Sequence, residues 1–330
     1  MSRRPVDRRR LIRLRRTVAF LGLVVIVVVG VLAWRIVGPD VTRLERSLRG
    51  TDAKTATSGG TPLDTTAFSP GACEAFAPTD GDNGKTVFLD AGHGGIDPGG
   101  SGTTESGRTI YESGINLAIE LDAMALLRAR GYRVVVSRTG DTTVVRLHAD
   151  DISDGVLSLQ GSHDDVVARD ECANLARADA LIGIYMDSGA TPDNAGAVTV
   201  YDTDRSFSAA NSQLAGLMEN DVLKAMNDQG WDIPNDGAVS DIGYGSAVGD
   251  PSAGGLAEAA LDYNHLLLIG PAQSKYFTTP SDMPGAVIEP LYLTDPFEGS
   301  IAVSSGGQKV IAGGLATAVE QFLAPSKKAG

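Results

Sequence analysis

The sequence has few cysteines, few histidines and, beyond its first residues, little positive charge. Two cysteines and four histidines occur among its 330 residues. Eight of the 28 lysines and arginines lie in residues 1–16 beside one acid, which leaves 28 − 8 = 20 basic and 41 − 1 = 40 acidic residues, a net charge of about −20. Because a domain of that charge repels nucleic acid, we exclude nucleic-acid binding as its function.

Two motifs are also missing. No Gly-x-Ser-x-Gly sequence occurs, so we do not expect a serine nucleophile on a strand-to-helix elbow. No small-x-small cleavage site follows the apolar run of residues 18–34, which favours a retained anchor over a removed signal peptide. That run is at the lower limit of what spans a bilayer, and the arginines before it place the N-terminus in the cytoplasm. We therefore expect a single-pass protein of the cell membrane with an extracytoplasmic C-terminal domain.

The two cysteines, Cys73 and Cys172, suit that location. In an oxidising compartment an isolated pair most simply forms one disulfide, which here would close a loop of about 100 residues. Two unpaired cysteines in the core are the alternative. We expect the disulfide, which would link the segment before the first strand to a later helix.

Beyond the anchor, the chain predicts one α/β domain. Strands are expected at residues 86–90, 132–137, 181–186, 197–201, 266–269 and 286–293, and helices at 115–130, 166–177, 206–226 and 308–323. This alternation is typical of an α/β fold with a mainly parallel twisted sheet and helices on both faces. The expected layout is a basic cytoplasmic arm at 1–16, a transmembrane anchor at 17–37, a flexible stalk at 38–84, the domain at 85–324 and a tail at 325–330.

The residues that bear chemistry lie in three segments. His93 belongs to the glycine-rich turn 90–95 after the first strand, where glycines allow positive φ and leave space around the imidazole ring. Glu112 precedes a helix, so its carboxylate can point back toward the strand ends, where ligand sites of such sheets lie. Glu289 lies in an otherwise apolar strand and there requires a partner or a function. His265, by contrast, precedes a predicted strand and is expected to be structural.

Together these segments resemble the zinc-dependent N-acetylmuramoyl-L-alanine amidases of bacterial cell walls. The matching sequences are Leu-Asp-Ala-Gly-His-Gly-Gly at 89–95, Tyr-Glu-Ser-Gly-Ile-Asn-Leu at 111–117 and Pro-Gly-Ala-Val-Ile-Glu-Pro-Leu at 284–291. The resemblance covers residues 85–323 and implies a phosphorylase/hydrolase-like fold. It also implies zinc as the cofactor, His93 and Glu112 as two of its ligands, and Glu289 as the catalytic general base.

The third zinc ligand departs from the family's pattern. Members of the family usually have a histidine at the end of the third predicted strand, where this sequence has Tyr185. Direct ligation by Tyr185, ligation by Asp187 on the same side of an extended strand, and a weak or absent metal are the alternatives. We assign Asp187 as the third metal ligand. His148 and His163, in an acidic segment at 142–167 that is expected to be a solvated loop, are further surrogates.

Two functions are consistent with these residues. The resemblance implies a hydrolase that uses zinc and Glu289 to cleave the amide between the lactyl group of N-acetylmuramic acid and L-alanine in peptidoglycan. The alternative is a catalytically weak amidase-like domain that binds peptidoglycan or a cell-division or cell-wall partner. The presence of His93, Glu112 and Glu289 together favours the hydrolase, whereas Tyr185 favours the binding protein.

Overall fold

The computed structural model describes residues 59–242, 259 and 262–325. The predicted basic arm, the predicted anchor at 17–37 and the first part of the predicted stalk lie outside the described residues. Within the described ranges, no helix is long and apolar enough to cross a membrane. The structure therefore leaves the predicted anchor untested.

The described residues form one eight-stranded sheet in the order β1-β2-β6-β3-β9-β12-β10-β11. The strands are β1 (Thr61–Pro62), β2 (Ala72–Phe76), β3 (Thr86–Ala91), β6 (Arg133–Arg138), β9 (Ala180–Ile184), β10 (Ala197–Tyr201), β11 (Asn235–Ser240) and β12 (Gly285–Glu289). The four central strands are parallel, as is the pair β10–β11. Antiparallel pairing joins β1 to β2, β2 to β6 and β10 to β12. The predicted α/β fold with a mainly parallel sheet is confirmed.

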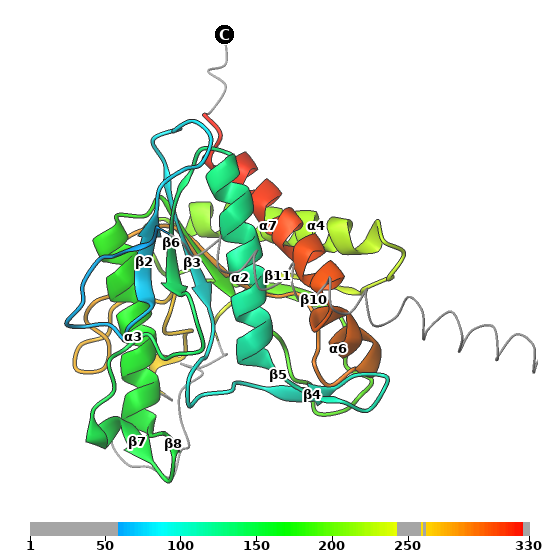
Figure 1. The fold of residues 1–330 in the computed structure, drawn as a ribbon, viewed down its shortest axis with the longest axis horizontal. Coiled ribbons are helices and arrows are strands. Elements are labelled where there is room, and N and C mark those ends of the chain that lie inside the picture. Colours follow the sequence, from blue (N-terminus) through cyan, green and yellow to red (C-terminus); the bar gives the residue numbers. More distant parts are fainter. Residues whose placement is uncertain (1–58, 243–258, 260–261, 326–330) are drawn as a thin grey trace, which may run out of the picture. The chain divides into compact units, whose positions relative to one another are not determined.

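Helices cover both faces of the sheet. In Figure 1, α3 (Leu159–Ala176) lies on one side, and α2 (Glu112–Ala129) and α7 (Ser305–Leu323), which pack together, lie on the other. Helix α4 (Ser208–Asn227) packs against α7 and the strands β10 and β12. The shorter elements are β4 (Ser101–Thr103), β5 (Thr109–Tyr111), η1 (Ala149–Asp151), β7 (Ile152–Ser153), β8 (Val156–Leu157) and α6 (Pro296–Ala302).

The folded domain begins earlier than the sequence predicts. Strands β1 and β2 lie within the segment that was expected to be a flexible stalk, and β2 pairs with β6. Phe68 and Phe76 are buried in the core. The stalk prediction is therefore wrong for residues 61–76, because a few buried aromatic side chains hold a segment whose composition is otherwise polar.

The predicted disulfide is confirmed. Cys73 on β2 is bonded to Cys172 on α3, with their Cα atoms 5.7 Å apart and 99 positions separating them in the chain. In the chain-entropy model a closed loop of this length stabilises the folded state by about 4–5 kcal/mol. The bond thus joins β2, which pairs antiparallel with β1 and β6, to the helix that carries part of the candidate site.

Two other expectations fail. Residues 267–269 are buried, but residues 266–269 form a turn rather than a strand, since a short apolar run fits either. The segment 142–167 is not a solvated loop: it forms η1, the hairpin β7–β8 and the first turns of α3. Helix α3 begins at Leu159 because Ser158 caps it, its hydroxyl accepting a hydrogen bond from the backbone N–H of Gly161.

Candidate functional site

The glycine-rich turn leaves β3 at the carboxyl edge of the parallel strands. His93 has a φ of +62°, a left-handed conformation that costs a non-glycine residue about 1–2 kcal/mol. Gly92 is required because a Cβ there would lie 2.3 Å from the ring of Tyr185. Strain at a position that the surrounding structure holds in place is typical of a functional site.

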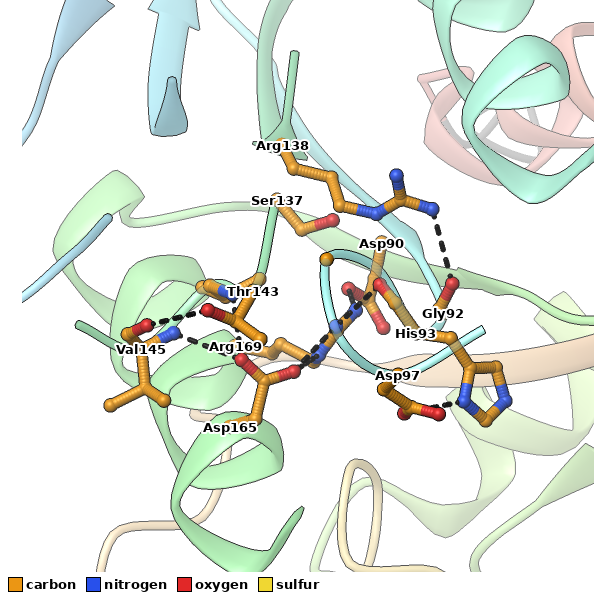
Figure 2. A network of polar contacts seen from close by, with 12 residues as sticks. Asp90, Gly92, His93, Asp97, Ser137, Arg138, Thr143, Val145, Asp165 and Arg169 are labelled. Atoms are coloured by element: carbon orange, nitrogen blue, oxygen red, sulfur yellow. Dashed lines mark hydrogen bonds and ion pairs between the residues drawn. The ribbon is translucent and has the colours of Figure 1, made fainter. Parts of the chain in front are cut away.

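Arg169 on α3 holds the turn from beneath (Figure 2). Its guanidinium is 1% exposed, forms ion pairs of 2.6 Å with Asp90 and 2.7 Å with Asp165, and donates a hydrogen bond of 3.0 Å to the carbonyl oxygen of His93. Because all these partners converge on one planar group, the backbone of His93 is fixed relative to α3.

Arg138, the last residue of β6, holds the same turn through its backbone (Figure 2). It is fully buried and donates hydrogen bonds to the carbonyl oxygens of Ala91, Gly92 and Ser113. Ser113 is the second residue of α2, so Arg138 also links the turn to the helix that carries Glu112.

The imidazole of His93 lies between two carboxylates. Its Nδ1 is 2.7 Å from Asp97, and its Nε2 is 3.3 Å from Glu112, the first residue of α2. Burial alone would lower the pKa of His93, but its hydrogen bonds to Asp97 and Glu112 and their negative charges raise it to about 10. For Glu112, burial alone would raise the pKa. The hydrogen bond and the positive charge of His93 outweigh burial and lower the pKa of Glu112 below its ordinary value.

Backbone donors fix the Glu112 carboxylate in place. One oxygen accepts hydrogen bonds from the N–H of Met186 and the side-chain amide of Asn116, and the other accepts from the N–H of Gly100. The expectation that this carboxylate points back toward the strand ends therefore agrees with the geometry.

Glu289 ends β12, next to the end of β9. Its carboxyl group is hydrogen-bonded to Asp187. Burial, followed by the negative charges of Asp187 and Glu112, raises the pKa of Glu289 to about 8. Near neutral pH this group therefore holds a proton that it can exchange.

Tyr185 is partly buried and packs against the hydrophobic core. Its hydroxyl donates a 3.1 Å hydrogen bond to Asp90, whose other oxygen binds Arg169. Burial, together with the charge of Asp90, raises the pKa of Tyr185 well above its ordinary value. Tyr185 therefore acts as a neutral hydrogen-bond donor, which does not favour its ligation as a phenolate.

One cavity of about 420 Å³ brings the predicted residues together. Its lining includes His93, Glu112, Tyr185, Asp187 and Glu289. An apolar wall from α3, β12 and residues 266–268 completes it.

The two surrogate histidines do not line this cavity. Both ring nitrogens of His163 are already engaged, with Asp164 and the carbonyl oxygen of Tyr276, and His148 is exposed. The structure thus gives no support to either histidine as a third ligand.

A family model described as N-acetylmuramoyl-L-alanine amidase matches residues 87–321. The chain belongs to this amidase family. The N-acetylmuramoyl-L-alanine amidase AmiA of Salmonella typhimurium is 30% identical over 136 residues, which are 41% of this chain and 39% of that relative's length. The CwlD amidase of Clostridioides difficile, solved in complex with the GerS lipoprotein, has a TM-score of 0.52 at 21% identity, covering 72% of this chain and 98% of that one. This last likeness shows the fold.

Amidases of this family are in general zinc-dependent, and two positions in this amidase domain suit the ion. Asp97 engages Nδ1 of His93 and leaves Nε2 facing Glu112, as outer carboxylates do for histidines that bind metals. In the described part of the chain, the ligand atoms of His93, Glu112 and Asp187 do not all lie within 4.8 Å of one another. The residues therefore fit zinc at two positions, and in this arrangement Asp187 does not complete the group.

Sequence reasoning gave no role to the residues that hold the amidase turn in place. Asp97 lies four positions after His93, two residues beyond the matched sequence at 89–95, and that spacing was a usable signal. Arg138 follows a run of buried valines, and a charge at the end of such a run requires partners. Arg169 contacts the turn across 76 positions of chain, which no local pattern reveals.

Glu120 on α2 gives this domain a testable pH dependence. Burial raises its pKa to about 8, so the folded state retains a proton that the unfolded state releases above about 4.5. The free energy of unfolding is therefore expected to fall between pH 5 and pH 8, by ~2–4 kcal/mol from this group. Urea unfolding of Glu120→Gln should show a shallower fall, whereas the exposed control Glu105→Gln should match the wild type. Equal slopes in the wild type and Glu120→Gln would contradict the assignment.

Proposed function

We propose that this domain hydrolyses the amide between the lactyl group of N-acetylmuramic acid and L-alanine in peptidoglycan. The supporting observation is that Glu289, with its exchangeable proton, lines one cavity with His93 and Glu112 in a chain of the amidase family. A carboxyl group whose pKa lies near the working pH is suited to both accepting and donating a proton.

The residues that would hold zinc are His93, Glu112 and Asp187. When bound, zinc supplies a Lewis acid that polarises the scissile carbonyl and lowers the pKa of water. Asp97 orients the imidazole of His93, and the backbone donors to Glu112 keep its carboxylate in position.

Glu289 carries the proton in this proposal. It accepts a proton from the attacking water and gives it to the departing amino group of L-alanine. When Asp187 turns toward the metal ligands, Glu289 loses its hydrogen bond to Asp187 and becomes free to act as the base. The apolar wall beside it limits the access of bulk water to the reacting amide.

The proposed location is the outer side of the cell membrane, with residues 17–37 as the anchor. The arginines of residues 1–16 and the apolar run that follows them support this location. A tether at that place suits an enzyme whose substrate is a polymer beside the membrane.

Release of stem peptides from purified sacculi tests the proposal. The wild type should release peptides with free L-alanine amino termini, and Glu112→Gln should release them at least about 100-fold more slowly. Binding of the wild type to sacculi without any release would contradict hydrolysis and support the catalytically weak alternative.

Tyr185→His is expected to bind zinc at least about tenfold more tightly than the wild type, because it supplies a histidine nitrogen as the third ligand. Affinity can be measured by competition with a chromophoric chelator. Tyr185→Phe is the matched control, since it loses the same hydrogen bond to Asp90 without adding a ligand. Equal affinities of Tyr185→His and Tyr185→Phe would show that position 185 does not reach the ion.

A further inference from the structure

A second group of potential metal ligands lies at the far edge of the sheet. Asp202 follows β10, and Asp241 follows its parallel neighbour β11. Strand β10 runs antiparallel to β12, and Val198 near the start of β10 lies opposite Glu289 at the end of β12. The carboxyl ends of β10 and β11 therefore lie at the other end of the strands from Glu289. His265 joins these aspartates from the loop before residue 266. The group therefore belongs to a separate site.

The three side chains converge on one point. Nδ1 of His265 lies 2.9 Å from Oδ2 of Asp202 and 3.2 Å from Oδ2 of Asp241. Both aspartates are 0% exposed, and the histidine side chain is 12% exposed. One potential ligand atom from each residue lies within 4.8 Å of those of the other two. Within the described ranges, no other three His, Cys, Asp or Glu residues meet this condition.

The aspartates are held in place, yet each keeps one buried oxygen that accepts no hydrogen bond. Oδ1 of Asp202 accepts the backbone N–H groups of Asp204 and Arg205, and Oδ2 of Asp241 accepts that of Leu266. Oδ2 of Asp202 and Oδ1 of Asp241 are buried and accept no hydrogen bond. A single proton on Nδ1 of His265 cannot serve both carboxylates, so the protein alone leaves buried negative charge unsatisfied.

We propose that Asp202, Asp241 and His265 bind one divalent transition-metal cation, Zn²⁺ or Mn²⁺. Ligands at about 2.0–2.2 Å from one ion lie roughly 3–3.5 Å apart, close to the separations observed around Nδ1. The mixture of imidazole and carboxylate suits these two ions better than Ca²⁺ or Mg²⁺, which prefer oxygen ligands alone. Nε2 of His265 points toward the exposed carboxylate of Asp204, 3.7 Å away, which is an electrostatic contact longer than a hydrogen bond.

The ion would stabilise a wall of the catalytic cavity. Leu266, Leu267 and Leu268 line that cavity and directly follow His265. Leu266 also donates its N–H to Asp241. One ion would thus join the ends of β10 and β11 to the loop that carries this wall, without contacting the reacting groups.

Calorimetric titration of the full chain with ZnCl₂ and with MnCl₂ tests the proposal. His93→Gly is used as the background, because it removes a ligand of the first site and glycine adopts the positive φ of that position readily. This background should bind about one equivalent of ion. Adding His265→Ala should abolish binding, whereas adding the exposed His148→Ala as a control should leave it unchanged.

Asp241→Asn provides a second measurement that preserves the shape of the side chain. In the same background it should weaken binding at least about tenfold and should reduce the rise in Tm that Zn²⁺ produces. A folded His93→Gly protein that binds neither ion would overturn the proposal, as would undiminished affinity in Asp241→Asn. The group would then be a metal-free ion pair that links two strands to a loop.

Discussion

Glu289→Gln is expected to lower kcat for the release of stem peptides by about 10²–10⁴-fold, because the amide can neither accept nor donate the proton in hydrolysis. The same substitution should leave the fold intact and raise the free energy of unfolding. The native carboxyl is buried beside Asp187 and Glu112, and its pKa of about 8 shows that its charge is unfavourable there. Loss of activity with a gain in stability is the pattern of a catalytic group whose placement destabilises the fold.

Activity and urea unfolding of the same preparations measure both effects. Glu219→Gln is the matched control: Glu219 on α4 is also buried with a raised pKa, but it contacts Thr199 and does not line the cavity. We expect its activity to stay within about twofold of the wild type. If Glu289→Gln kept more than about a tenth of the activity, Glu289 would not be the general base.

The sequence was sufficient to place the candidate site residues that lie at the end of a strand or at the start of a helix. His93 follows a strand, Glu112 begins a helix and Glu289 ends a strand, and the parallel order brings all three to one edge of the sheet. Such placement follows from strand direction alone, since the carboxyl ends of parallel neighbours meet.

Other parts of the fold could not be predicted because tertiary contacts decide them. The strand β2 is short and follows a polar segment, and it is held by Phe76, the disulfide and pairing with β6. Residues 266–269 have the composition of a strand, but they form a turn that lies over Gly183 of β9. Short apolar runs do not distinguish these outcomes.

The polar groups around the site depend on contacts that are distant in sequence. His265 meets Asp202 across 63 positions, and Arg169 meets Asp90 across 79. No periodicity or motif in the sequence links the two members of such a pair. The sequence shows each of them only as an ionisable residue near apolar neighbours. Such a pattern predicts that a partner exists and leaves its identity open.

Arg169→Met is expected to lower the free energy of unfolding by about 3–5 kcal/mol, because it leaves two buried carboxylates without their cation. Asp90 is fully buried and, among the described residues, its carboxylate would keep the hydrogen bond from the hydroxyl of Tyr185, while Asp165 would keep those from the backbone N–H groups of residues 144 and 145. Burial lowers the pKa of Arg169, but the charges of Asp90 and Asp165 outweigh it and raise the pKa well above its ordinary value, as expected of a cation bound in both pairs.

Two further variants separate lost charge compensation from lost packing. Arg130→Met removes a surface ion pair with Glu320, both partners being at least 30% exposed, and should cost less than about 1 kcal/mol. Adding Asp165→Asn to Arg169→Met removes one of the uncompensated charges and should restore about 1–2 kcal/mol, measured as the coupling in a double-mutant cycle of urea unfolding. If the double variant were less stable than Arg169→Met, Arg169 would stabilise the turn of His93 mainly through its hydrogen bonds to backbone carbonyls, and the charge of Asp165 would be secondary.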